Sequence, residues 1–264
     1  MKKSWLVFGC FFSLACGSQN DFDKAARFVR PLPVTGANPV EFKLVDGRPA
    51  NPGEYPQVVY IRIFATGSDH SAWCTATLVG NNVILTASHC ADDGRENAVF
   101  KINNKEYTAK LTQSPWYSPS GVPTFHDVAL GLLTRSVSDV PPMNVGGETL
   151  EGKKLVLAGY GCTNSDGTGG NDGVLRVGEN TVLTFDKWEM AFSRQTGAVT
   201  CFGDSGGPSF VVVDGRTRQL GVHSSGDYQS VFDIRTDIPK TRQFFSEWAS
   251  ENNVDICGVT RDCP

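Results

Sequence analysis

Apolar residues in this chain come in short runs, and this pattern constrains the fold more than any other feature of the sequence. From residue 44 onward, runs of Val, Ile, Leu and Phe are interrupted by Gly, Asn, Asp and Pro. Runs this short and rich in β-branched residues are typical of strands, and their close spacing favours an antiparallel sandwich or barrel. The runs lie at Val58–Phe64, Val83–Leu85, Val99–Ile102, Val128–Leu133, Leu155–Ala158, Val182–Phe185 and Phe210–Val213.

Three further signals organise the region. Asp214-Gly215 after an apolar run predicts a two-residue hairpin turn. Residues 136–149 contain Pro-Pro and Gly-Gly pairs, and we expect them to link two strand-rich halves. Pro239 opens a segment with aromatic residues at helical spacing, which predicts a C-terminal helix. These aromatic residues are Phe244, Phe245 and Trp248.

Composition excludes some classes of protein. Hydrophobic residues are 40% of the 264 positions and charged residues 20%, so the chain can bury a core. A net charge of -4 lacks the basic excess of a nucleic-acid binder, and we expect no nucleic-acid partner. Eight cysteines argue against a reducing cytosol.

The N-terminus has the layout of an export signal. A short basic start precedes the apolar run Trp5–Phe12, and small residues follow it. The run is too short to span a bilayer as a permanent helix, so residues 1–16 are predicted to be a signal peptide. We therefore expect a secreted or cell-envelope protein.

The end of this signal allows two kinds of processing. Leu14–Gly17 resembles the lipobox of bacterial lipoproteins, in which the cysteine, here Cys16, is acylated. Ordinary cleavage after Ala15 is the alternative. Residues 17–43 are polar and contain three prolines, and we expect a propeptide or linker. Contact with a membrane would come only through a lipid on Cys16.

Three short segments carry the residue types of nucleophilic catalysis. In the first, His89 lies beside Cys90 after an apolar run, and in the second Asp127 precedes a very apolar run. In the third, residues 201–208, three glycines and a proline surround Ser205. Such a backbone adopts conformations that only glycine tolerates at low cost. It can aim consecutive N–H groups at one point, as an oxyanion site requires.

Together these segments resemble the signatures of chymotrypsin/trypsin-like serine peptidases, in that family's chain order: Thr86-Ala87-Ser88-His89-Cys90, Asp127-Val128-Ala129-Leu130 and Gly203-Asp204-Ser205-Gly206-Gly207-Pro208. The resemblance implies an all-β fold of two antiparallel six-stranded barrels with a C-terminal helix, over residues 44–264. It implies a serine endopeptidase that acts on proteins or peptides without a cofactor or metal. We expect a monomer.

The resemblance assigns a role to each motif residue. Ser205 would be the nucleophile, and His89 the base that removes its proton and returns it to the leaving amine. Asp127 would orient His89 and stabilise its protonated form. The backbone N–H groups of Gly203 and Ser205 would form the oxyanion hole.

Substrate contacts follow from the same resemblance. Ser224 and Gly226 would pair with the substrate backbone as an added strand. Val199 and Thr200 would lie in the specificity pocket, where members that cut after Arg or Lys have an aspartate in place of Val199. An unpaired charge buried there would cost several kcal/mol. We therefore predict an apolar residue before the scissile bond.

The start of the predicted domain resembles that of a zymogen. Leu44-Val45-Asp46-Gly47 is similar to the Ile-Val-Gly-Gly start of active family members, and Lys43 precedes it. Cleavage after Lys43 would free an amino group at Leu44 that pairs with Asp204 and holds the oxyanion turn. Because the predicted pocket does not accept lysine, a separate trypsin-like protease would make this cut.

Six cysteines follow the signal, and they allow 15 pairings. The family pairs the two cysteines that flank the histidine segment. The family partner of Cys201 is missing, and Cys162 lies on a loop that passes near the nucleophile turn in this fold. The resemblance therefore implies the pairs Cys74–Cys90, Cys162–Cys201 and Cys257–Cys263.

Two other functions compete with a peptidase. Gly203–Gly207 also satisfies the G-x-S-x-G pattern of esterases, but that fold needs an acid and then a histidine after the serine, and only His223 follows Ser205. The chain could also be a catalytically silent binding module on the same fold. Such modules usually lose a catalytic residue, and all three positions are filled here.

Overall fold

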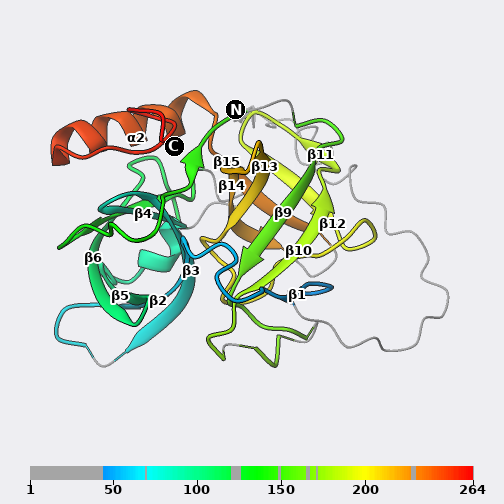
Figure 1. Cartoon of the computed structure of the whole chain (residues 1–264), viewed down its shortest axis with the longest axis horizontal. Coiled ribbons are helices and arrows are strands. Elements are labelled where there is room, and N and C mark those ends of the chain that lie inside the picture. The colour runs from blue at the N-terminus through cyan, green and yellow to red at the C-terminus, as the bar shows by residue number, and fades with distance from the viewer. Residues whose placement is uncertain are drawn as a thin grey trace, which may run out of the picture. The chain divides into compact units, whose positions relative to one another are not determined.

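Residues from Leu44 onward fold into two β-sheets followed by a C-terminal helix (Figure 1). The computed structural model describes residues 44–68, 70–119, 126–147, 150–164, 167–170, 172–226 and 230–263. The predicted signal peptide and spacer, including Cys16 and Lys43, lie outside the described residues.

The first sheet is a closed barrel in the order β2-β3-β4-β7-β6-β5, with every neighbouring pair antiparallel. Along one strand, Tyr107, Ala109 and Leu111 are buried, and the residues between them are exposed. This period of two gives the barrel an apolar interior. The six strands are β2 (Val58–Phe64), β3 (Ser71–Gly80), β4 (Val83–Thr86), β5 (Asn97–Ile102), β6 (Lys105–Gln113) and β7 (Ala129–Leu133).

The second sheet has nine strands, and eight of them run in the order β1-β10-β9-β13-β14-β15-β12-β11. The remaining strand, β8, pairs in parallel with β14. The nine strands are β1 (Arg48–Pro49), β8 (Asn144–Val145), β9 (Lys154–Gly159), β10 (Arg176–Thr181), β11 (Thr184–Phe185), β12 (Glu189–Ser193), β13 (Pro208–Val213), β14 (Arg216–Gly226) and β15 (Ser230–Arg235).

A buried asparagine brings the two sides of this second sheet together. The Asn180 side chain, on β10, donates to the carbonyl oxygens of Ser193 on β12 at 3.0 Å and Ala198 at 2.7 Å. The hydroxyl of Thr196 donates to the Asn180 carbonyl oxygen at 2.7 Å. Side-chain hydrogen bonds therefore hold the two sides of the second sheet together, whereas strand pairing closes the first barrel.

Helix α2 (Pro239–Asn252) begins with the predicted proline and ends before Asn253, whose φ of 52° is left-handed. The helix follows the second sheet in sequence but packs on the first barrel (Figure 1). Its buried aromatic residues share an apolar core with strands of that barrel. This core includes Phe244, Phe245 and Trp248 of the helix and Val79, Val83 and Leu133 of the barrel.

The sequence predicted the fold class, the hairpin turn at Asp214-Gly215 and the C-terminal helix correctly. The chain is mostly β, with a closed six-stranded barrel, a second sheet and a C-terminal helix. Asp214 and Gly215, with φ of 52° and 75°, form the turn between β13 and β14. The apolar runs lie on strands, except that the run from Val182 contributes only Thr184–Phe185.

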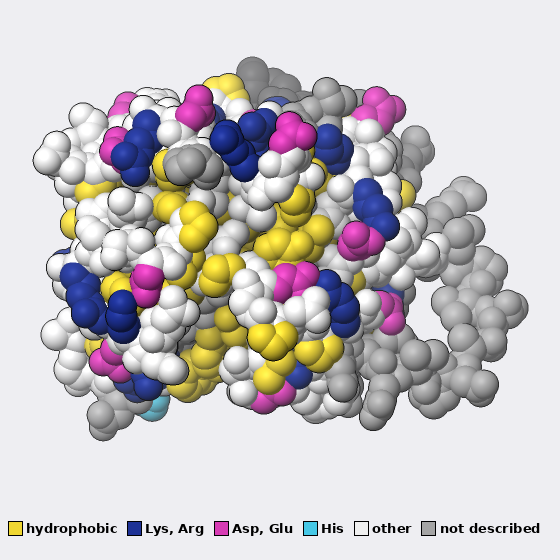
Figure 2. Space-filling model, viewed as in Figure 1, with side chains coloured by type: hydrophobic (Ala, Val, Ile, Leu, Met, Phe, Trp, Pro, Cys, Tyr) yellow, Lys and Arg dark blue, Asp and Glu magenta, His cyan; other side chains and the backbone are white. Residues whose placement is uncertain are grey.

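The surface in Figure 2 mixes charges of both signs around a central region of hydrophobic side chains. Within the described ranges, no helix is long and apolar enough to cross a membrane. The proposed lipid on Cys16 concerns residues outside these ranges and stays a prediction.

Three disulfide bonds join the pairs expected from the family resemblance. Cys74–Cys90 lies beside His89, Cys162–Cys201 connects a loop to the nucleophile segment, and Cys257–Cys263 closes a small loop after α2. Their partners are 16, 39 and 6 residues apart in the sequence. The bond that closes the longest loop removes the most entropy from the unfolded chain.

Loss of the Cys162–Cys201 bond should therefore cost more stability than loss of Cys257–Cys263. We expect the double alanine variants to lose roughly 4 and roughly 2 kcal/mol of unfolding free energy, respectively. Urea unfolding followed by tryptophan fluorescence measures both losses. An equal loss, or a larger one for the Cys257–Cys263 pair, would contradict this account.

Candidate active site

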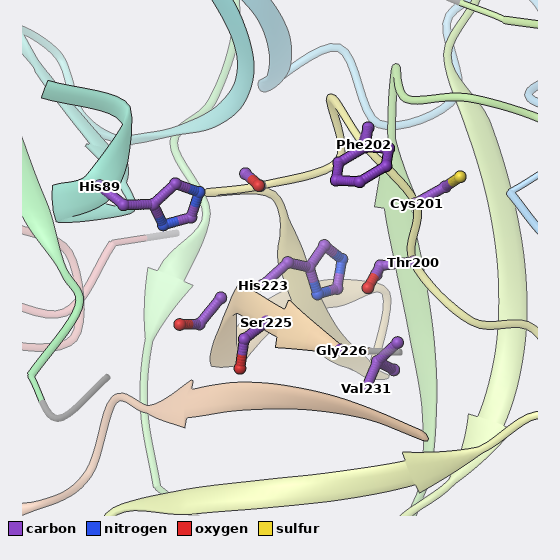
Figure 3. Close-up of a pocket in the computed structure, with 10 residues that line it drawn as sticks. His89, Thr200, Cys201, Phe202, His223, Ser225, Gly226 and Val231 are labelled. Atoms are coloured by element: carbon purple, nitrogen blue, oxygen red, sulfur yellow. The ribbon is translucent and has the colours of Figure 1, made fainter. Parts of the chain in front are cut away.

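One pocket brings together residues from both sheets (Figure 3). Its volume is about 340 Å³. The 3-10 helix η1 (Ser88–Ala91) contributes a histidine from the first half, and the loop before β13 contributes the predicted nucleophile. The ends of β14 and β15 complete the wall. The lining residues are His89, Thr200, Cys201, Phe202, Ser205, His223, Ser224, Ser225, Gly226 and Val231.

His89 and Asp127 form a two-point contact. The His89 backbone N–H donates to Asp127 Oδ1 at 2.8 Å, and the His89 Nδ1 lies 2.7 Å from Asp127 Oδ2. The Asp127 side chain is fully buried, whereas that of His89 is 31% exposed. Because the carboxylate accepts a hydrogen bond, Nδ1 carries the proton, and Nε2 is left as the basic nitrogen.

Ser224 supplies a third donor to Asp127. Its hydroxyl donates to Asp127 Oδ2 at 2.6 Å. Sequence reasoning assigned Ser224 to the substrate backbone and missed this side-chain contact, because Ser224 is 97 residues away in the chain. The carboxylate thus receives hydrogen bonds from both halves of the molecule.

The pKa of His89 is raised above its ordinary value. Burial lowers this pKa, but the hydrogen bond to Asp127 and the charges of Asp127 and Asp92 favour the protonated ring more strongly. His89 therefore holds a proton more readily than a free imidazole does.

The turn around Ser205 depends on two glycines. Gly203 and Gly206 have φ of 96° and 82°, a region that other residues rarely adopt. A Cβ on Gly206 would lie 2.0 Å from Thr86 Oγ1 and 2.5 Å from the Thr75 carbonyl oxygen. Both the backbone angle and the lack of space therefore require glycine at this position.

Thr75 holds this turn from the neighbouring barrel. Its hydroxyl donates to the Gly203 carbonyl oxygen at 2.9 Å, and its backbone N–H donates to the Ser205 carbonyl oxygen at 2.9 Å. The Gly206 N–H donates to the His223 carbonyl oxygen at 2.8 Å. Within the described residues, no acceptor binds the N–H groups of Gly203 and Ser205. Sequence reasoning missed Thr75, which no motif marks.

Asp204 is buried under the same turn. Its carboxylate accepts hydrogen bonds from the Gly161 N–H at 2.7 Å and the Cys201 N–H at 2.8 Å. Burial raises the pKa of Asp204 to about 6, although the charge of His223 and these two hydrogen bonds oppose the rise. A cation beside Asp204 would relieve this cost of burial.

The remaining predicted pocket residues separate into two groups. Thr200 and Gly226 line the pocket, but Val199 does not. Val199 has no exposed surface and packs in an apolar cluster with Leu44 and Val45, and its N–H donates to the Val45 carbonyl oxygen at 2.9 Å. The position of Val199 thus gives no support for an apolar pocket floor.

The cluster Cys74, His89 and Cys90 has metal-ligand side chains close together. Both cysteines form one disulfide bond, so neither offers the thiolate that a metal ion needs. This cluster therefore does not fit a metal.

Comparisons with known proteins agree with the fold and identify the family. A family model described as Trypsin matches residues 44–237. A trypsin-like protease of Streptomyces glaucescens is 27% identical over 74% of this chain and 77% of its own length, and chymotrypsin of Phaedon cochleariae is 26% identical over 95% and 100%. The solved structure of HL collagenase shares the fold, with a TM-score of 0.65 and 20% identity over 80% of this chain and 99% of its own. The chain therefore belongs to the Trypsin family of serine endopeptidases, which hydrolyse peptide bonds.

The contact between Ser224 and Asp127 should tune the titration of His89. In Ser224→Ala the Asp127 carboxylate loses one donor, so its negative charge acts more fully on His89. We expect the pKa of His89 to rise further above its already raised value. Histidine NMR titration measures the change, and an unchanged or lowered pKa would contradict the role given to Ser224.

Proposed function

We propose that Ser205, His89 and Asp127 form the catalytic triad of this endopeptidase. The Ser205 hydroxyl attacks the peptide carbonyl carbon while His89 Nε2 takes its proton. The carbon–nitrogen bond then breaks, the leaving amine takes the proton from His89, and water hydrolyses the acyl-enzyme to restore Ser205. The observation that carries this proposal is the two-point contact between His89 and the buried Asp127.

The negative oxygen of the tetrahedral intermediate would bind to the N–H groups of Gly203 and Ser205. Support comes from the positive φ of Gly203 and from the Thr75 hydrogen bonds that fix both carbonyl groups of this turn. A fixed donor of this kind typically contributes ~3 kcal/mol to catalysis. The backbone of Ser224 and Gly226 would pair with the substrate as an added strand.

The identity of the residue before the scissile bond needs a different argument from the one that the sequence suggested. The predicted apolar preference depended on Val199, which does not line the pocket. The residues that do line the pocket therefore determine which side chain it accepts, and an apolar preference remains the alternative.

Replacement of the nucleophile tests the triad directly. We expect Ser205→Ala to lose several orders of magnitude in peptide hydrolysis while keeping the thermal midpoint of the wild type. Ser250→Ala, on the exposed side of α2, is the matched control and should keep full activity. Unchanged hydrolysis by Ser205→Ala would exclude the proposed mechanism.

We further propose that the enzyme is made as a zymogen and activated by a trypsin-like protease that cuts after Lys43. Leu44 and Val45 are 1% and 0% exposed and pack beside Val199, which supports a buried position for a new N-terminus. The Leu44 ammonium group would pair with Asp204, the buried carboxylate under the oxyanion turn. A buried cation and carboxylate stabilise one another where each alone is costly.

This activation predicts a loss of activity in alkaline solution. Pairing with Asp204 raises the pKa of the Leu44 amino group above its free value of ~8, so the charge is kept at neutral pH and lost above that raised pKa. Activity should therefore fall reversibly in this alkaline range.

Lys43→Gln with its leader intact should stay inactive toward peptides, and full activity in that variant would exclude activation at Lys43.

The leader supports a proposal about location. We propose export by the signal peptide and acylation of Cys16. No cysteine lies between positions 17 and 73, so no disulfide bond can hold the leader to the catalytic region after the cut. Activation would then release the enzyme from the membrane. Mass spectrometry of the precursor shows the modification, and an unmodified N-terminus after Ala15 would indicate ordinary secretion.

A further inference from the structure

The pocket contains a second histidine that the proposed mechanism does not use. His223, on β14, is only 1% exposed, yet it lines the pocket together with Thr200 and Gly226. Figure 3 shows its ring beside Thr200, with a ring nitrogen turned toward the Thr200 side chain.

A chain of buried polar groups fixes this ring from behind. The His223 Nδ1 lies 2.9 Å from Asp233 Oδ1, and the Ser209 hydroxyl donates to Asp233 Oδ2 at 2.5 Å. Asp233 and Ser209 have no exposed surface. Because Asp233 accepts the hydrogen bond, Nδ1 must carry a proton, so the state of Nε2 decides the charge of the ring.

The other nitrogen of this ring is unsatisfied. His223 Nε2 is buried and makes no hydrogen bond of ordinary geometry among the described residues, and the Ala158 carbonyl oxygen is the polar group that acts on it. Buried polar atoms are normally paired, and an orphaned one in a pocket wall indicates a group that a ligand completes. A neutral ring would present a lone pair there, whereas a protonated ring would present an N–H donor with a positive charge.

The charged groups around His223 favour the protonated ring. Burial lowers the pKa of His223, but the charge and hydrogen bond of Asp233, the charge of Asp204 and the Ala158 carbonyl oxygen together raise it above its ordinary value. Among the described residues that line the pocket, none is Asp or Glu, so none of these residues would neutralise a positive ligand.

We propose that the pocket recognises an acidic side chain, Glu or Asp, before the scissile bond, with His223 Nε2 and the Thr200 hydroxyl donating to its carboxylate. The proposal rests on the proposed function, since it assigns a substrate class to the same site. Asp233 is a positioning residue, which holds the ring and keeps it charged. Gly226 and Val231 leave the opposite wall without a charge.

The experiment compares peptides that differ only in the residue before the scissile bond: Glu, Gln, Asp, Leu, Phe and Arg. Glutamine is the neutral match for glutamate, so the ratio of the two kcat/KM values isolates the charge. We expect a ratio of about 10 to 100 at pH 7, the range for a buried hydrogen bond to a charged group. A higher kcat/KM for Leu, Phe or Arg than for Glu would overturn the inference.

Variants then assign the preference to residues. His223→Gln should reduce the Glu-to-Gln ratio to about 1, and Thr200→Val should reduce it several-fold. Asp233→Asn keeps an acceptor for Nδ1 but removes the charge, so the ratio should fall at a lower pH than in the wild type. His70→Gln, at an exposed histidine outside the pocket, should leave the ratio unchanged. A ratio that persists in His223→Gln would contradict the assignment.

The pH dependence distinguishes recognition from a structural role. Between the pKa of the substrate carboxyl group and that of His223 the ratio should be high, and it should fall as pH rises and the ring loses its charge. Titration of His89 affects both peptides and cancels in the ratio. If the Glu-to-Gln ratio of kcat/KM did not change with pH around pH 7, His223 would be a structural residue and the proposal would be overturned.

Labelling with a serine-reactive fluorophosphonate distinguishes a failure of this inference from a failure of the proposed function. If it labels Ser205 but Glu is not preferred, the inference is wrong and the proposed function stands. If it labels nothing and no peptide is cleaved by the activated protein, the proposed function is wrong and the inference falls with it.

Discussion

The hydrogen bonds of the buried Asp127 carboxylate join the two halves of the candidate site. It receives two hydrogen bonds from His89 in the first half of the chain and one from Ser224 at the end of β14 in the second. A fully buried carboxylate without partners would cost several kcal/mol, so these three donors stabilise its burial. The same contacts hold His89 in the pocket that Ser205 also lines.

The turn around Ser205, in the second half of the chain, is also held by a residue of the first half. Thr75, on β3 of the closed barrel, binds the carbonyl oxygens of Gly203 and Ser205, which belong to the loop before β13. Gly206 has room for no side chain because Thr75 and Thr86 lie against it. This turn is therefore shaped by the first barrel, although every residue of its motif lies in the second half of the chain.

Local chemistry explains which features the sequence could predict. The hairpin at Asp214-Gly215 and the helix after Pro239 depend on neighbouring residues, and both were correct. Ser71–Gly80 and Lys105–Gln113 carry too many polar residues to stand out as apolar runs, and pairing with their neighbours makes them strands.

The candidate site was predictable where residues belong to motifs and not where they meet only in space. His89, Asp127 and Ser205 come from short patterns. Thr75 instead contacts a loop residue far away in the chain, and His223 meets Asp233 across the neighbouring strands β14 and β15. The position of Val199 also depends on contacts that no motif marks. Counting back from Ser205 gives its place in the chain, but the side chain packs in the core with Leu44 and the neighbouring Thr200 lines the pocket.

The central claim is that the pair of His89 and Asp127 activates Ser205, and the rate of reaction with a fluorophosphonate tests it most directly. In the activated protein we expect a single modified residue, Ser205, and a rate that rises with pH through the raised pKa of His89. The rate should fall by about 10³ to 10⁴ in Asp127→Asn, which leaves His89 in the wrong tautomer. Modification at another residue, or an equal rate in Asp127→Asn, would contradict the account.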